Sequence, residues 1–139
     1  PDERLQSAIE GSAGIANIHS FIANELANGY ETVVGERGIR LSAGQRQRIG
    51  IARALYHDPE VLVLDEATSN LDQITERNVH LAIEQAAAAK TVIMIAHRLS
   101  TTRSCDALYL LEHGRLIAQG SYDSLLLSSD RFRTMVGTT

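Results

Sequence analysis

Residues 61–96, VLVLDEATSNLDQITERNVHLAIEQAAAAKTVIMIA, decide the fold of this chain. The runs VLVLD at 61–65 and TVIMIA at 91–96 are apolar almost throughout, which is typical of strands buried on both faces of a parallel sheet. Between them, residues 71–88 have the apolar spacing of a helix. A strand, a helix and a strand in this order predict a βαβ unit, and therefore an α/β fold with parallel strands.

Helices and a hairpin are predicted on either side of this unit. The spacing of apolar residues from Ser42 predicts a helix that ends near His57, because the residue before a proline disfavours helix and Pro59 follows Asp58. The remaining predicted elements are two or three helices up to about Tyr30, a turn-rich connector at 29–39, two short strands around His113 and Gly114 within 107–120, and closing helices at 121–129 and 130–136.

Length, charge and cysteine content are those of a globular domain and argue against some classes of function. The 139 residues are enough for one domain with a core. Seventeen acidic against thirteen basic residues give a net charge of −4, which argues against nucleic-acid binding driven by bulk charge. The single cysteine, Cys105, has no partner for an internal disulfide, which fits a reducing compartment. No apolar run approaches the roughly 20 residues that a spanning helix needs, so work at a membrane would require a partner.

Acidic residues and a histidine follow the two apolar strands. Asp65 and Glu66 end the first strand, and His97 follows the second. Ligands bind at the carboxyl ends of strands in open α/β sheets, so these side chains are expected at one edge. A carboxylate there suits Mg²⁺, a second can activate water, and a histidine can donate to a phosphate, which together favour phosphoryl transfer to water. Taken alone, an aspartate at a strand end is equally typical of a turn or a helix cap, and His97 is equally typical of a hydrogen-bonded structural histidine.

The helix start at Ser42 has two interpretations. Ser42 and Gln45 have the spacing of a capping box. The same helix N-terminus is also suited to an anion, because Gly44 permits close approach and Arg46 and Arg48 add positive charge. A solvated basic face is the alternative explanation for the five arginines between positions 37 and 53.

These stretches resemble a known family, the ABC-type ATP-binding domains. LSAGQRQRIGIARAL at 41–55 resembles their signature helix, VLVLDEATSNLD at 61–72 their Walker B strand and D-loop, and IMIAHRLST at 93–101 their H-loop. ANIHSFI, GYETVVGERG and HGRLIAQGSYDSLL resemble the exporter branch. The order and spacing agree over nearly the whole chain, so the resemblance implies a partial P-loop NTPase (RecA-like) core with parallel strands and an ABC helical subdomain.

The resemblance implies roles for individual residues. Asp65 would act on Mg²⁺, Glu66 would be the catalytic base for the attacking water, and His97 would contact the γ-phosphate of ATP. The signature residues Ser42, Ala43, Gly44 and Gln45 would close on ATP held by a second ATP-binding domain in a head-to-tail dimer.

Two further contacts are implied by the same resemblance. Asp72 would lie at the dimer interface, although its position also suits the first turn of the next helix. Glu36 and Arg37 would contact the transmembrane domain. One residue departs from the family pattern: Ala43 stands where a glycine is usual, and its methyl group is expected to reduce the tolerance for close phosphate approach without abolishing the site.

The phosphate-binding loop of the family is not found in these residues. The motif Gly-x-x-x-x-Gly-Lys-Ser/Thr is absent, and Lys90, the only lysine, follows four alanines rather than a glycine-rich loop. The resemblance therefore implies a C-terminal fragment that lacks the P-loop and the Q-loop, with 1–57 in the helical subdomain and 58–139 in the ATPase core. Such a fragment is expected to bind Mg-ATP weakly or not at all, and to leave part of its sheet uncovered.

The function implied is ATP binding and hydrolysis that drive a membrane exporter, at the cytoplasmic face of the membrane. The partners implied are ATP, the second ATP-binding domain and the transmembrane domain, with no nucleic acid. Two alternatives remain. One is a non-enzymatic interaction module, which the presence of both Glu66 and His97 disfavours; the other is a chromosome-maintenance or DNA-repair ATPase, which the acidic charge disfavours.

Overall fold

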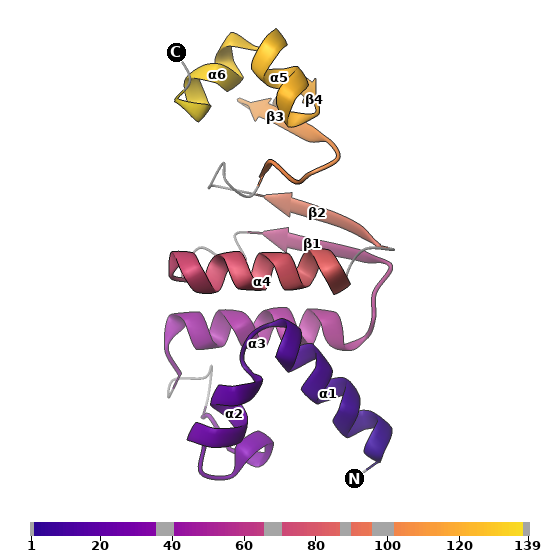
Figure 1. Cartoon of the computed structure of the whole chain (residues 1–139), viewed down its shortest axis with the longest axis vertical. Helices are drawn as coiled ribbons and strands as arrows, with labels where there is room; N and C mark the ends of the chain where they lie inside the picture. Colours follow the sequence, from indigo (N-terminus) through magenta and orange to yellow (C-terminus); the bar gives the residue numbers. More distant parts are fainter. Residues whose placement is uncertain (1, 36–40, 66–70, 87–89, 96–101, 138–139) are drawn as a thin grey trace. The chain divides into compact units, whose positions relative to one another are not determined.

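The computed structural model describes residues 2–35, 41–65, 71–86, 90–95 and 102–137. The chain divides into two compact units, Pro1–Ile95 and Ala96–Thr139, here called the N-terminal and C-terminal units. The N-terminal unit contains α1 (Glu3–Ile15), α2 (His19–Glu25), the 3₁₀ turn η1 (Gly29–Glu31), α3 (Ala43–Tyr56), β1 (Val61–Asp65), α4 (Gln73–Ala86) and β2 (Thr91–Ile95) (Figure 1).

The predicted βαβ unit is confirmed. β1 and β2 pair in parallel, with Val61 opposite Thr91 and Asp65 opposite Ile95 (Figure 1). α4 lies between them in sequence, as the crossover of a parallel pair requires. The parallel register places the carboxyl ends of both strands at one edge of this two-stranded sheet.

One core holds the N-terminal unit together. α1 packs against α3 and, less extensively, against α4. Both long helices after the connector bury the apolar faces that their spacing predicts, with Ala52 and Leu55 buried on α3 and Val79 and Ile83 on α4. The buried residues of this core are Ala13, Ala16, Ile18, Ile22, Ile51, Ala52, Leu55, Leu62, Leu64, Leu71, Val79 and Ile83.

The two strands are not buried on both faces, and that expectation is wrong for this chain. Leu62 and Leu64 point into the core with 3% and 5% of their surface exposed, whereas Val63 remains 61% exposed. On β2, Ile93 and Ile95 are each 52% exposed. The reason is that successive side chains of a strand point to opposite faces, and the core of this unit covers one face only. The expected uncovered apolar face is thereby confirmed.

α3 begins and ends where its sequence predicts. Ser42 is its N-cap, and the helix stops at Tyr56 before a turn in which Asp58 has a positive φ of 49°. Pro59 follows at once, and a residue before a proline disfavours the right-handed helical conformation, so the helix does not continue through Asp58. The connector predicted after α2 starts with η1 and continues without helix or strand through Gly35, while 36–40 lie outside the described residues.

The C-terminal unit is a hairpin with two helices against it. β3 (Leu108–Glu112) and β4 (Arg115–Gly120) are antiparallel around His113 and Gly114, which both have positive φ, as a tight hairpin turn requires. α5 (Tyr122–Ser128) and α6 (Asp130–Val136) close the unit. Its small core centres on Tyr122, Leu125 and Phe132. The hairpin and the closing helices are as predicted.

Candidate functional site

The first turn of α3 is built as a capping box. The Ser42 hydroxyl oxygen accepts from the Gln45 backbone N–H at 3.1 Å, and the Gln45 side-chain oxygen accepts from the Ser42 N–H at 2.8 Å. Ser42 and Ala43 are exposed, and Gly44 and Gln45 are half-buried. A hydroxyl that accepts one hydrogen bond still has its own O–H to donate. The capping interpretation is therefore confirmed, and the turn remains accessible from solvent.

Two arginines of this helix hold its first turn to the surrounding backbone. Arg46 Nη1 donates to the carbonyl of Leu41 at 2.5 Å. Arg48 Nη1 donates to the carbonyl of Asn17 at 2.6 Å, and its Nε donates to the carbonyl of Gly44 at 3.4 Å. Sequence reasoning assigned both arginines to charge alone and missed these bonds, because Asn17 lies between α1 and α2 and no local pattern links it to Arg48.

Asp65 lies at the carboxyl end of β1 with an exposed side chain, opposite Ile95 at the end of β2. This is the edge where strand-end ligands are expected. Glu66, which follows Asp65, and His97, two positions after Ile95, lie outside the described residues, as do Glu36 and Arg37. No group of three or more His, Cys, Asp or Glu side chains within the described ranges could hold a metal ion by itself.

Asp72 caps α4. Its Oδ1 accepts from the Thr75 backbone N–H at 2.9 Å, just before the helix begins at Gln73. The hydrogen bond from the Thr75 side chain, followed by the bond from the Thr75 backbone, lowers the pKa of the Asp72 carboxyl below its ordinary 3.8. Both bonds favour the ionised carboxylate, since they are stronger to a charged acceptor. Asp72 therefore has the structural role at the start of α4 that its position in the sequence also allowed.

Asp72→Asn is expected to remove part of the acid sensitivity of this chain. A carboxyl with a depressed folded-state pKa stabilises the fold above its unfolded pKa, and loses that contribution as pH falls through its folded-state value. Asparagine caps a helix without titrating, so the thermal midpoint at pH 7 should change little, while its fall on acidification should become shallower. Asp123→Asn, an exposed change in the first turn of α5, is the matched control. Equal acid profiles for Asp72→Asn and the unmodified chain would contradict this.

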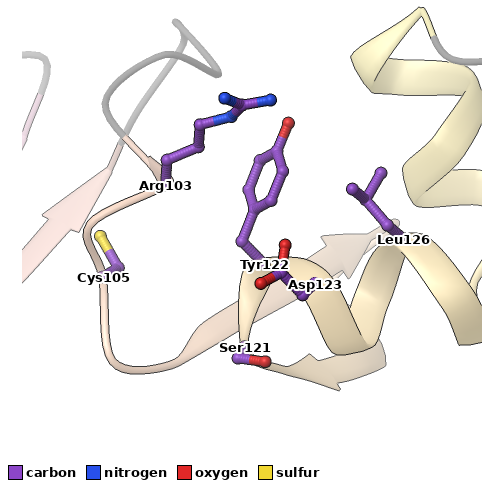
Figure 2. A pocket seen from close by; sticks show the side chains of 6 residues that line it. All are labelled: Arg103, Cys105, Ser121, Tyr122, Asp123 and Leu126. Carbon is purple, nitrogen blue, oxygen red and sulfur yellow. The ribbon is translucent and has the colours of Figure 1, made fainter.

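A pocket of about 380 Å³ lies in the C-terminal unit. Figure 2 shows its lining: Arg103, Cys105, Ser121, Tyr122, Asp123 and Leu126. The guanidinium carbon of Arg103 lies 5.1 Å from the centre of the Tyr122 ring, within the range of a cation–π contact. The predicted site residues among the described ones lie instead on the N-terminal unit, at the start of α3, the end of β1 and the start of α4.

None of the helices within the described ranges is long and apolar enough to cross a bilayer.

Comparison with known proteins identifies the family. The family model described as ABC transporter matches residues 12–69. The chain is 46% identical over 135 residues to the ABC-type transporter MDR1 of Aureobasidium melanogenum, covering 97% of this chain and 10% of that protein. It is 50% identical over 121 residues to the heterocyst differentiation ATP-binding protein HepA of a Nostoc species, covering 87% of this chain and 20% of that protein.

A solved structure agrees with these relatives. A bacterial Atm1-family ABC exporter with ATP bound superposes with a TM-score of 0.87 at 42% identity, over 94% of this chain and 23% of that one. The chain spans between a tenth and a fifth of the length of the two curated relatives. Its strand order, capped signature helix and acidic strand end therefore have a common explanation: the chain belongs to the ABC transporter family, as part of an exporter-type ATP-binding domain.

Proposed function

We propose that the protein containing this chain is a membrane exporter driven by ATP hydrolysis, and that this chain forms part of its ATP-hydrolysing domain. The observation that carries the proposal is the similarity to an ABC exporter with ATP bound over 94% of the chain. The ABC transporter family model matches residues 12–69, which include the start of α3 and the end of β1. In this assignment residues 1–57 belong to the helical subdomain and 58–139 to the ATPase core.

Three residues perform the chemistry in this proposal: Asp65, which ends β1, and Glu66 and His97, which follow the two strands in the sequence. Asp65 would hold Mg²⁺, which would stabilise the charge on the phosphates, and its exposed carboxylate at the end of β1 is the oxygen donor that this ion prefers. Mg²⁺ needs only one or two protein carboxylates when phosphate oxygens complete its shell, which fits a site with few protein ligands. Glu66 takes the proton of the attacking water, and His97 donates to the γ-phosphate.

In this proposal, the first turn of α3 contacts ATP that is bound by a second ATP-binding domain. Ser42, Ala43, Gly44 and Gln45 contact the γ-phosphate of ATP held by a partner ATP-binding domain in a head-to-tail dimer. The exposed start of the helix supports this, because N–H groups at a helix N-terminus and its positive dipole end favour phosphate. Asp72 lies at the same interface. The dimer works at the cytoplasmic face of the membrane against a transmembrane domain, which Glu36 and Arg37 contact.

The 139-residue chain alone is expected to bind Mg-ATP weakly or not at all in titration calorimetry, whereas the full-length protein is expected to bind Mg-ATP and release phosphate. The reason is that a P-loop supplies the backbone N–H groups and the lysine that hold the β- and γ-phosphates. No such motif occurs in these residues, and Asp65 and Glu66 present only negative charge to ATP.

The two arms of this experiment have separate meanings. A full-length protein that releases no phosphate from Mg-ATP would overturn the proposed function. Binding of Mg-ATP by the isolated chain as tight as that by the full-length protein would show that these residues contain a phosphate-binding site of their own.

A further inference from the structure

The buried side chains of α3 lie in its second half. Ile51, Ala52 and Leu55 are each at most 9% exposed, whereas none of residues 43–50 is buried. In that first half, Ile49 is partly buried against the core. Apolar packing therefore fixes the second half of the helix more firmly than the first. The first turn, which carries the proposed nucleotide contacts, depends more on polar contacts for its direction.

Arg48 provides such a contact between the first half of α3 and another element. Its Nη1 donates to the carbonyl of Asn17 at 2.6 Å, and its Nε donates to the carbonyl of Gly44 at 3.4 Å. Helix side chains point back toward the N-terminus, which places this guanidinium over the turn that contains Gly44. Because the guanidinium is a rigid fork of donors, one side chain joins the first turns of α3 to the end of α1.

Asn17 is a well-fixed acceptor for this bond. It follows α1 with a positive φ of 53°. Its N–H donates to the carbonyl of Gly14 at 2.9 Å, and the N–H of Ile18 donates to the carbonyl of Ala13 at 2.9 Å. The neighbours on both sides, Ala16 and Ile18, are 0% exposed. Hydrogen bonds and burial together hold the turn, so its carbonyl has a defined position.

Electrostatics favour the same contact. The carboxyl end of a helix carries partial negative charge, and the last turn of α1 contains no basic residue. The Arg48 guanidinium, bound to the carbonyl of Asn17, brings a positive charge to that end from α3. A hydrogen bond from a charged donor is stronger than one between neutral groups. The Nη1 donor of Arg48 is thereby committed to the protein backbone.

We propose that Arg48 is a positioning residue for ATP hydrolysis, which fixes the first turn of α3 on the end of α1 so that Ser42–Gln45 meet ATP on the partner domain. This rests on the proposed function. Arg48 itself does not touch nucleotide. A P-loop outside these residues holds the ATP, so binding survives the loss of this bond. The fraction of bound molecules with a correctly placed first turn falls, which lowers kcat more than it raises KM.

The test is Mg-ATP turnover by the full-length protein in lipid nanodiscs. Arg48→Met keeps an unbranched side chain and removes the donors and the charge. It is expected to lower kcat by about three- to tenfold, with KM for ATP within about twofold. Arg48→Lys keeps the charge and can donate to one carbonyl, but it lacks the fork, so it should recover part of the lost turnover.

Arg4→Met is the matched control. Arg4 is an exposed arginine at the amino end of α1, the opposite end from Asn17. The change removes the same charge from the same unit, and turnover should equal that of the wild type. A second readout is amide hydrogen exchange of residues 45–50, which should be faster in Arg48→Met than in Arg4→Met.

Asn17→Val tests the other end of the bond. A β-branched residue is strained at positive φ, so the turn must shift and carry its carbonyl away from Arg48. This variant should also lower kcat. Combined with Arg48→Met it should add little, because both changes break one bond. Calorimetric Mg-ATP binding by each variant of the full-length protein shows that the ATP-binding domain is folded.

The outcomes separate this role from the proposed function. Full kcat in Arg48→Met, with an active wild type, overturns the role of Arg48 alone. So do multiplying effects of Arg48→Met and Asn17→Val, or unchanged exchange at residues 45–50. A raised KM with full kcat, restored by Arg48→Lys, would show a direct contact with phosphate instead. A lower thermal midpoint with full kcat would reduce the bond to a contribution to stability. A wild type that hydrolyses no Mg-ATP overturns both proposals.

Discussion

Glu66→Gln in the full-length protein is expected to lower Mg-ATP turnover by about 10²- to 10⁴-fold, the range for loss of a general base. Glutamine has almost the shape of glutamate but cannot take a proton from the attacking water. Binding should persist, because the carboxylate of Glu66 adds only negative charge beside ATP and Mg²⁺ is assigned to Asp65. Phosphate release under saturating Mg-ATP measures the effect, and calorimetry on the same variant measures binding.

Glu60→Gln is the control for this change. Glu60 precedes β1 at the opposite end of the strand from Asp65, with an exposed side chain. Glu60→Gln removes the same charge from a residue next to β1, at the end of the strand opposite Asp65. Turnover of Glu66→Gln within a few-fold of that of Glu60→Gln would remove Glu66 from the mechanism and leave the base unassigned.

Ile83→Ala is expected to destabilise the 139-residue chain by about 2–5 kcal/mol, the usual loss when a buried isoleucine is cut to alanine. Ile83 lies on α4 with 2% of its surface exposed, within the core of the N-terminal unit. Its removal leaves a cavity among helix and strand side chains that are already closely packed. Urea unfolding followed by far-ultraviolet circular dichroism measures the change.

Leu81→Ala on the same helix separates burial from helix content. Leu81 has the same number of carbons as Ile83 but is 46% exposed. Both changes replace a larger residue with alanine, the best helix former, so the difference between the two variants reports burial. Equal losses of stability would show that α4 does not pack through the face that contains Ile83.

The identities of the strands and helices follow from local patterns. The apolar runs at 61–64 and 92–95 lie in β1 and β2, and their short length and content of β-branched residues favour strands over a buried helix segment. Ser42 and Gln45 predict the start of α3, because the hydrogen bonds of a capping box join residues within one helical turn. The parallel pairing follows from the helix between the strands, since a crossover of that length carries the chain back to the same edge.

Burial and long-range contacts do not follow from such patterns. The apolar run at the first strand does not predict that Val63 is exposed and Leu62 buried. The exposure of each side chain depends on which face of the sheet other elements cover. From the sequence, the only role predicted for Arg48 was to add positive charge. Its hydrogen bond to the carbonyl of Asn17 was not predicted, because the two residues are 31 positions apart. Tyr30 and His19 are 11 positions apart, and only the packing of α2 and η1 brings them together.

For this protein the sequence by itself determined the α/β class and the order of the elements, which rest on short-range periodicity and capping, and its motifs were enough to indicate the family by resemblance. The tertiary structure alone decided which face of the β1–β2 sheet is covered, that Arg48 binds the carbonyl of Asn17, and that His19 and Tyr30 meet. The physical reason is range: local patterns act over one or two turns, whereas burial and distant hydrogen bonds depend on how separate elements pack.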